Sequence, residues 1–323
     1  MSRIYPKDIG EDELVGRLVS KLSMDSSVLI GPGDDCAVVE MGEPGRVQLL
    51  KTDSIVEGVH FTPEIAAGRV GWKALARSLS DIAAMAGTPA HALVTLHAPL
   101  TCPVDRLEGI YAGINRCAER FGVSVVGGET SCTPGPLSVT ISMTGAVVPE
   151  LCALRSTGEV GDILLVSGVL GGSLDGHHLD FVPRLAQAKW LVENIGVGAM
   201  MDLSDGLAKD LPRMAAASQC SYYLNDTLLP IRDGCSVAQA LNDGEDYELL
   251  IALTPSAAKR ALELWPKEFP HIPLTAIGSL HEEMRDDLGG IELEGGFDHF
   301  GKEARNWADQ EFAPVAELGE IAD

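Results

Sequence analysis

Acidic side chains stand beside glycines where predicted strands end, and this placement constrains the chain more than any other feature of its sequence. Asp34 and Asp35 follow the turn Gly31-Pro32-Gly33. Further acids in similar positions are Asp53, Glu129, Asp202, Asp205, Glu245 and Asp246. Any single pair could be a turn or a helix cap, because Asp and Gly dominate turns. Together the acids favour a cleft lined with oxygen ligands, which suit Mg²⁺ or Ca²⁺ better than zinc.

Asp81 differs from these acids because it lies inside a predicted apolar helix, between Leu79 and Ile82. Arg77 precedes it by four residues, so an ion pair within the helix is one interpretation. The other is a carboxylate that points inward toward a metal ion. The spacing alone leaves both open.

The charge balance limits the partners of the chain. Its 323 residues include 47 Asp plus Glu and 24 Lys plus Arg, a formal net charge of -23. Nucleic acid or an anionic membrane would be repelled, and there is no Lys/Arg run, so we expect neither as a partner. Metal cations, or anionic substrates already neutralised by metal, fit this charge.

The cysteines and the N-terminal residues bear on the compartment. Seven cysteines form no C-x-x-C pair, which argues against a disulfide framework or a structural zinc site. The first eight residues contain no apolar signal region, and no apolar run approaches the 18 residues of a membrane span. The sequence therefore predicts a cytoplasmic protein.

Hydrophobic periodicity predicts strands mixed with helices along the whole chain. In the first half we expect helices at 14–22, 70–86 and 107–121, and strands at 28–30, 47–51, 91–97, 123–126 and 137–148. In the second half we expect strands at 163–167, 199–203 and 247–253, and helices at 184–195, from 205 and from 256. The second half reads as an α/β layered unit. A domain boundary is predicted between Pro149 and Glu150.

Short motifs exclude some functions and leave others open. No Walker A pattern and no G-x-S-x-G elbow occur, so a P-loop is excluded. Residues 202–206 read as a helix start with Ser204 as N-cap, where free N–H groups could hold a phosphate. His177 and His178 are adjacent without a spaced partner, so we expect no metal role for them. His60 lies in a polar loop, where most histidines are solvated.

Taken together, several segments resemble one known family. They are the runs at 31–37, 52–61, 73–76, 80–85, 127–130, 202–207, 244–249 and 296–300. In this order they are similar to the thiamine-monophosphate kinase family, within the aminoimidazole ribonucleotide synthetase-like ATP-binding superfamily.

The resemblance implies an α+β fold of two domains. Residues 1–149 would form an N-terminal domain that binds ATP and metal and mediates dimerisation, and residues 150–323 an α/β layered C-terminal domain. The N-terminal halves of two subunits would close a β-barrel between them, and nucleotide would lie in the groove between the domains. A homodimer is therefore expected.

The resemblance also implies a reaction, in which ATP donates its γ-phosphoryl group directly to the phosphate of thiamine monophosphate. The product would be thiamine diphosphate, and several Mg²⁺ ions would be needed. The acceptor phosphate is largely ionised near pH 7, since its second pKa is about 6, so no general base is required. The obstacle is bringing two anions together, which metal ions held by carboxylates overcome.

Roles carry over by matching motif. Catalytic positions are Asp53, Asp81 and Asp205. Metal contacts fall at Asp35, Lys51, Thr52, Asp53, Asp81, Glu129, Asp202 and Asp205. ATP contacts fall at Tyr111, Gly128, Glu129, Arg155 and Ser204, and contacts to thiamine monophosphate at His60, Glu245 and Phe297.

The sequence departs from the family near the expected site. Glu129 stands where Asp is usual, an arginine is missing after Thr130, Lys51 replaces a small residue, and the stretch 171–184 is shortened. Two alternatives follow: another ATP-dependent enzyme of the superfamily with a different acceptor, or a nucleotide-binding regulatory protein that has lost catalysis. A selenophosphate synthetase and a carbamoyl dehydratase are disfavoured, because the first cysteine is Cys36 and the C-terminal residue is Asp323.

Overall fold

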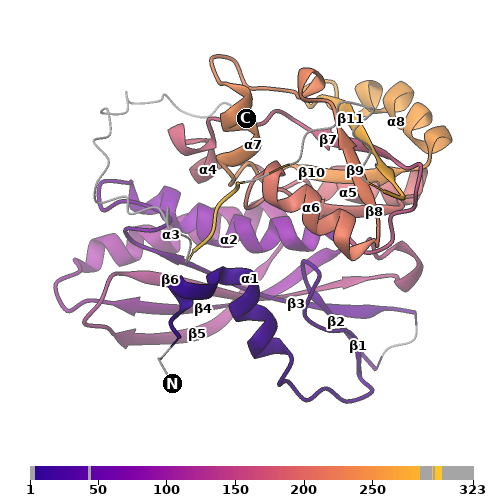
Figure 1. Ribbon diagram of the computed structural model, residues 1–323. Coiled ribbons are helices and arrows are strands. Elements are labelled where there is room, and N and C mark those ends of the chain that lie inside the picture. The colour runs from indigo at the N-terminus through magenta and orange to yellow at the C-terminus, as the bar shows by residue number, and fades with distance from the viewer. Residues whose placement is uncertain (1–3, 43–44, 284–292, 294, 300–323) are drawn as a thin grey trace.

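Two β-sheets form the framework of the structure, a computed structural model that describes residues 4–42, 45–283, 293 and 295–299 (Figure 1). The first sheet has the order β1-β2-β3-β6-β4-β5. Its strands are β1 (Val28–Ile30), β2 (Ala37–Glu40), β3 (Val47–Val56), β4 (Thr88–Ala98), β5 (Ser124–Cys132) and β6 (Ser138–Val147). Adjacent strands of this sheet run antiparallel, except β4 and β5, which run parallel to each other.

The second sheet has five antiparallel strands in the order β8-β10-β7-β11-β9. They are β7 (Ile163–Ser167), β8 (Ala199–Asp202), β9 (Ser221–Leu224), β10 (Leu249–Leu253) and β11 (Leu274–His281). The helices of this half are α4 (His177–Asp180), which packs on α2 (Ala67–Ala84) of the first half, and α5 (Leu185–Asn194), α6 (Leu207–Ala217), α7 (Val237–Asn242) and α8 (Pro255–Glu268). The α+β class of the chain is thus confirmed.

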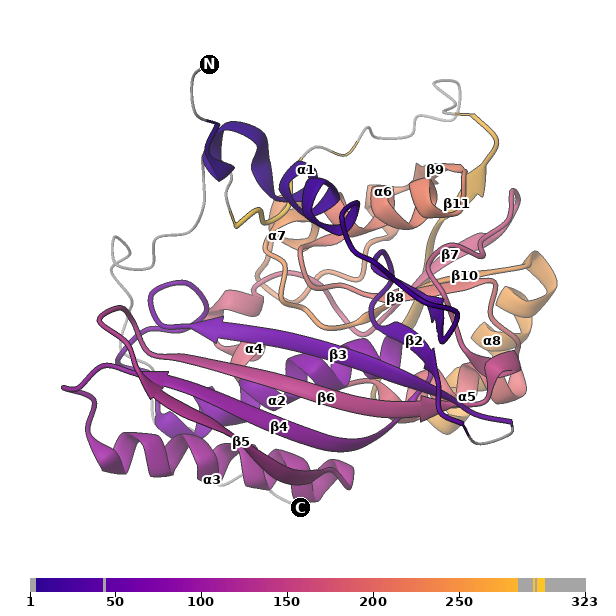
Figure 2. The ribbon, with the colours of Figure 1, turned by 90° about the horizontal axis from the view of Figure 1, so that it is seen from below.

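One face of the first sheet packs on two helices, α2 (Ala67–Ala84) and α3 (Val104–Phe121). Along β3, Leu49 and Ile55 are buried toward them, while Leu50 on the opposite face is 39% exposed. Figure 2 looks onto that opposite face, where β3, β6, β4 and β5 lie uncovered by the described chain. Leu93 and Val126 are also exposed there. This sheet therefore has one packed face and one open face.

Helix α2 is held tightly because glycines let α3 approach its backbone. A Cβ atom on Gly71 would lie 1.9 Å from the carbonyl oxygen of Ile110, and one on Gly113 would lie 2.0 Å from that of Gly68. The far end of α2 packs on the second sheet, where Ala83 shares a core with Met200 and Leu249. Helix α2 therefore lies between the two sheets, as Figure 1 shows.

Most predicted elements are present, but some acids sit elsewhere in them. Asp53 and Glu129 lie inside β3 and β5, not after them, because both strands continue through polar residues. Ser204 is not an N-cap: α6 begins at Leu207 after Gly206, and Asp210 accepts hydrogen bonds from the backbone N–H groups of Ser204 and Asp205 at 3.0 and 2.9 Å.

The first helix and the domain limits complete the comparison. Helix α1 (Pro6–Val19) ends before the predicted limit, and none of its residues, all of them described, is buried. The predicted boundary after Pro149 falls in the connection between the sheets and stays a prediction. Phe300 and the rest of the C-terminal segment up to residue 323 lie outside the described residues. Within the described chain, no helix combines the length and apolar character needed to cross a membrane.

Candidate active site

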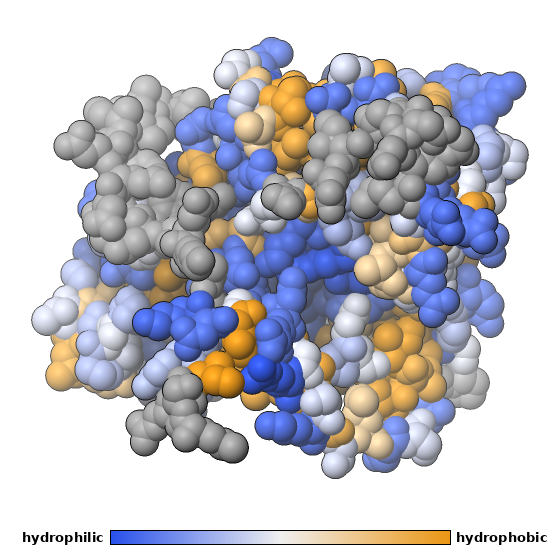
Figure 3. Space-filling view, in the orientation of Figure 1, coloured by the Kyte–Doolittle hydropathy of each residue, from blue (hydrophilic) through white to orange (hydrophobic). Residues whose placement is uncertain are grey.

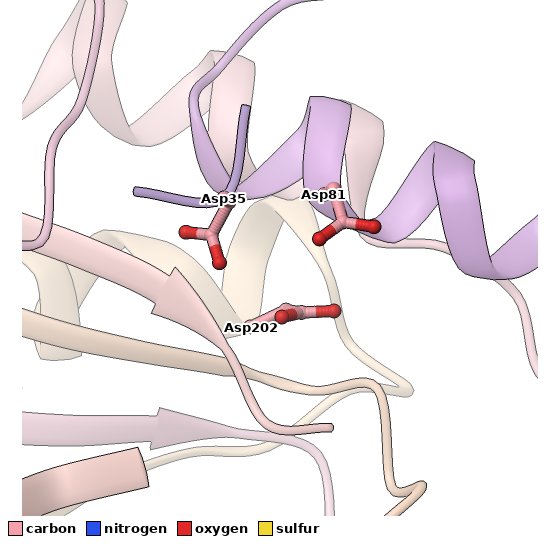
Figure 4. A group of neighbouring side chains, drawn as sticks. All are labelled: Asp35, Asp81 and Asp202. Atoms are coloured by element: carbon pink, nitrogen blue, oxygen red, sulfur yellow. The ribbon is translucent and has the colours of Figure 1, made fainter. Parts of the chain in front are cut away.

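Three buried carboxylates meet between the two sheets (Figure 4). Asp35 comes from the loop after β1, Asp81 from α2 and Asp202 from the end of β8. One oxygen of each lies within 4.8 Å of one oxygen of each other. Figure 3 shows a hydrophilic hollow between the upper and lower parts of the molecule. We call these three residues the aspartate cluster.

Basic and hydroxyl side chains surround the aspartate cluster. Lys51 Nζ lies 2.6 Å from Asp81 Oδ1, and Arg155 Nη2 lies 2.5 Å from Asp35 Oδ1. The Ser80 hydroxyl donates to Asp202 Oδ2 at 2.5 Å. Asp81 thus points inward to Lys51, which favours the inward orientation that the sequence left open.

Burial and mutual repulsion make these acids hard to ionise. Burial raises the pKa of Asp35 to about 7, although Arg155 opposes the shift. Burial likewise raises the pKa of Asp81 well above its usual value, and that of Asp202 despite the hydrogen bond from Ser80. A bound cation would offset this cost, because it favours the charged form of each acid.

The residues present fit a hard divalent cation. Asp35 Oδ2 is buried and has no hydrogen-bond partner in the described part of the chain, so one oxygen of the cluster is left to bind a ligand. Carboxylate oxygens are the ligands that Mg²⁺ takes in phosphate-handling sites. Neither thiol nor imidazole belongs to this group, which argues against a soft metal.

Asp53 faces the same side of the sheet as Lys51, two residues earlier on β3. Its Oδ2 lies 3.1 Å from Nε of Arg77 on α2. Arg77 therefore pairs with Asp53 on the neighbouring strand, and Lys51 takes the place beside Asp81. The result is a row of alternating charges between β3 and α2.

A second polar group lies nearer the start of α2 than the aspartate cluster. It is formed around Lys73 and includes Glu245, His178 and His60. Lys73 is fully buried, and its Nζ lies 2.8 Å from Glu245 Oε1 and 2.6 Å from His178 Nδ1. It also donates to the carbonyl oxygen of His60 at 2.7 Å. Burial would raise the pKa of Glu245, but Lys73 and His178 hold it well below its usual value. Glu245 is therefore a charged acceptor.

His60 is a neutral part of this second group, not the solvated histidine that its loop suggested. Burial, helped by the nearby charge of Arg77, lowers its pKa to about 2. Its Nδ1 accepts a hydrogen bond of 3.0 Å from the Val56 N–H. The ring centroids of His60 and His299 lie 5.2 Å apart, and those of His299 and Phe297 lie 4.7 Å apart. Three substrate positions predicted from the sequence thus lie along one connected path.

The segment that carries Phe297 is fixed to the start of α6. The Phe297 N–H donates to the carbonyl oxygen of Asp205 at 2.8 Å, and Lys209 Nζ donates to the Phe297 carbonyl oxygen at 2.6 Å. The Asp205 side chain pairs with Arg213 at 2.6 Å. Asp205 therefore links the C-terminal segment to helix α6.

Lys73 and His178 were missed by sequence reasoning. A usable signal exists for Lys73, because Lys73, Arg77 and Asp81 recur every four residues and so line one face of an otherwise apolar helix. His178 has no such signal. It reaches Glu245 because α4 packs on α2. This tertiary contact cannot be read from the neighbouring residues in the sequence.

Several predicted site residues lie apart from the aspartate cluster within one chain. The Thr52 side chain points to the open face, with its Oγ1 3.2 Å from Ser142 Oγ. Glu129 is aligned across the sheet with Thr95, Thr140 and Ser54. Directly opposed residues share a face, so Glu129 also lies on the open side, three strands from β3.

Two further predicted ATP contacts lie away from the cluster in one chain. Gly128 is on β5, where a Cβ atom would lie 1.8 Å from the Val94 carbonyl oxygen. Tyr111 is on α3 and packs against the core of the first sheet. Their role as ATP contacts stays a prediction. Within one chain, they do not lie beside Arg155, the other predicted ATP contact.

Comparison with known proteins agrees with this architecture. The family models of AIR synthase related proteins match residues 33–147 with their N-terminal domain and residues 159–286 with their C-terminal domain. These matches define the class: an AIR synthase related protein of two domains.

The relatives narrow this class. A thiamine-monophosphate kinase of Rhodopirellula baltica is 39% identical over 250 residues, covering 72% of this chain and 78% of that protein. One of Haemophilus influenzae is 32% identical and covers 90% and 98%. The solved structure of AaThiL complexed with AMPPCP and TMP superposes with a TM-score of 0.79, at 28% identity, covering 93% and 99%. The chain belongs to the thiamine-monophosphate kinase family.

Proposed function

We propose that this protein transfers the γ-phosphoryl group of ATP to thiamine monophosphate in a Mg²⁺-dependent reaction that forms thiamine diphosphate. The relatives' names support the reaction, and the two ligands named for the AaThiL complex support both substrates. The observation that carries the proposal is the aspartate cluster, whose Asp35 Oδ2 is buried and unpartnered among the described residues.

Asp35, Asp81 and Asp202 would hold Mg²⁺, with Asp53 and Asp205 as further acidic positions. When bound, the metal supplies positive charge that offsets the repulsion between the two phosphates. Arg155 adds a fixed positive charge beside Asp35 and would bind ATP phosphate. The acceptor phosphate is already ionised near pH 7, so the protein supplies position and charge and needs no base.

The second polar group would bind the thiamine part of the acceptor. Glu245 remains charged and can accept a hydrogen bond from the amine of the substrate ring. Lys73 and His178 fix its orientation. Phe297 would stack on the heteroaromatic ring, and the neutral His60 lies on the same path. The shortened stretch 171–184 supplies His178 to this second polar group.

A homodimer would unite the separated positions. The open face of the first sheet carries the exposed Leu50, Leu93 and Val126, and burying such a surface favours association. Thr52 and Glu129 lie on this same face, so a second copy placed there would bring Glu129 of one chain toward Thr52 of the other.

We propose a cytoplasmic enzyme, since none of the seven cysteines, all of them described, is in a disulfide.

A coupled ATP assay with thiamine monophosphate, thiamine and aminoimidazole precursors tests the function. We expect turnover with thiamine monophosphate in the presence of Mg²⁺, and none with thiamine. Turnover with a different acceptor alone would establish the other-enzyme alternative. Nucleotide binding without any turnover would establish the regulatory one, to which Glu129 and the missing arginine point.

A further inference from the structure

Lys51 places a fixed positive charge inside a group of side chains that is otherwise suited to metal. Its Nζ lies 2.6 Å from Asp81 Oδ1, and its side chain is 22% exposed. The short ion pair with the Asp81 carboxylate holds the amine as an ammonium group. A protonated amine has no lone pair, and Lys51 therefore cannot itself bind a metal through its side chain.

The backbone keeps this ammonium group close to the cluster. Lys51 lies within the ten-residue strand β3, directly opposite Met143 of β6. Its side chain points to the packed face, the same face as Asp53 and toward α2. Asp81 in turn is fixed by the close packing of α2 on α3 at Gly71 and Gly113. Both partners of this pair thus belong to rigid elements.

An ammonium group and a divalent cation compete for the same carboxylate. Mg²⁺ binds its oxygen ligands at about 2.1 Å, so an ion on Asp81 Oδ1 would lie within about 5 Å of the Lys51 nitrogen. Both are cations, and water is largely excluded where Asp81 is only 8% exposed. Repulsion between two cations in such a site is strong, so the Lys51 ammonium group and a divalent cation exclude each other at Asp81 Oδ1.

We propose that the Lys51 ammonium group stands in for one divalent cation of the aspartate cluster, so that this protein binds one fewer Mg²⁺ per chain than it would with a small side chain at position 51. This inference rests on the proposed function, in which the cluster holds Mg²⁺. Arg155 differs from Lys51, because it comes from a loop and pairs with Asp35, not with Asp81. Asp35 Oδ2, Asp202 and the other oxygen of Asp81, Oδ2, remain to bind metal.

The experiment counts bound ions directly. Mn²⁺ replaces Mg²⁺, and electron paramagnetic resonance measures free Mn²⁺ against full-length protein saturated with AMPPCP. We expect Lys51→Ser to bind one more Mn²⁺ per chain than the wild type. Lys189→Ser is the control, because Lys189 lies on α5 with a side chain 60% exposed and pairs only loosely with Glu193 at 3.8 Å. It should bind the wild-type number.

Thermal melting gives a second readout, which can be used even if the Lys51→Ser variant is less stable than the wild type. Without metal, Lys51→Ser should melt below the wild type, because Asp81 loses its partner. Millimolar Mg²⁺ should raise its Tm by more than it raises the wild-type Tm. Equal ion counts in the two proteins, or a Tm deficit that Mg²⁺ leaves unchanged, would overturn the role of Lys51. If no protein binds Mn²⁺ and no Tm responds to Mg²⁺, the metal-dependent function proposed above fails as well.

Discussion

The hydroxyl group of Ser80 on α2 donates a hydrogen bond of 2.5 Å to Asp202 at the end of β8. This contact joins the helix that lies between the two sheets to an edge strand of the second sheet. Ser80 therefore connects the two halves of the chain at the aspartate cluster itself.

Replacing Ser80 with Ala should lower the free energy of unfolding by about 1–3 kcal/mol, because it leaves a buried carboxyl group without a donor. Urea denaturation without metal measures this. Ser78→Ala is a matched control on the same helix: Ser78 is fully buried, and its hydroxyl has no hydrogen-bond partner in the described chain. Its loss should cost little, and equal losses in both variants would contradict the prediction.

Asp53→Asn should reduce kcat by roughly 10²–10³-fold, the size expected when a charged group that stabilises the transition state is removed. The variant keeps the shape of the side chain and should fold. Steady-state kinetics and a thermal melt check both points. Ser54→Ala changes the neighbouring residue, which faces the open side and contacts Thr140, and it should keep near-normal turnover. A destabilised Asp53→Asn enzyme with normal kcat would end the catalytic assignment.

Phe297→Ala should act on the acceptor alone. The backbone bonds of residue 297 to Asp205 and Lys209 remain, so the segment should stay in place. Loss of ring stacking, worth about 0.5–1.5 kcal/mol, should raise the KM for thiamine monophosphate by about 2- to 10-fold. The kcat and the KM for ATP should change little. A rise in the ATP KM instead would assign Phe297 to the nucleotide.

Asp246→Asn should flatten the pH dependence of stability. Burial raises the pKa of Asp246 to about 8, against a usual value near 4 in the unfolded chain. Between these pH values the folded protein holds a proton that the unfolded chain has released. Stability therefore falls as pH rises from 4 to 8, by up to about 1.4 kcal/mol per pH unit from this group.

Urea denaturation at pH 5 and pH 7, without metal, measures the slope. Asn keeps an oxygen to accept the 3.0 Å hydrogen bond from the Gly171 N–H but cannot titrate. Asp25→Asn is the control, since the Ser27 hydroxyl lowers the pKa of that exposed acid. It should not flatten the slope. Identical slopes in the wild type and Asp246→Asn would show that Asp246 is ionised throughout.

Local periodicity was sufficient to predict most elements, because apolar spacing directly reflects which face of a helix or strand is buried. The predicted strand 163–167 coincides with β7, and Asp202 does end a strand. Polar residues within strands defeated the same reasoning. The run Thr52-Asp53-Ser54 continues β3, since its side chains alternate between the charged packed face and the open face.

Pairing between elements was beyond the sequence. Arg77 precedes Asp81 by one helical turn, yet the structure pairs Arg77 with Asp53 and Asp81 with Lys51. Both choices depend on how β3 lies along α2. The contact of His178 with Glu245 likewise depends on tertiary packing. The family resemblance supplied the site residues that spacing alone could not assign.

In the proposed function, helix α2 would set the distance between the two parts of the acceptor site. Lys73 pairs with Glu245, the position proposed to bind the ring, and Asp81 belongs to the aspartate cluster, where phosphate transfer is proposed. Eight residues separate them, and an α-helix rises 1.5 Å per residue, so the two ends are about 12 Å apart along the axis. Because both positions are on one rigid helix, the proposed site would accept only molecules whose ring and phosphate are separated by a matching length. A molecule with the right ring but a longer or shorter arm would place its phosphate outside the reach of the aspartates.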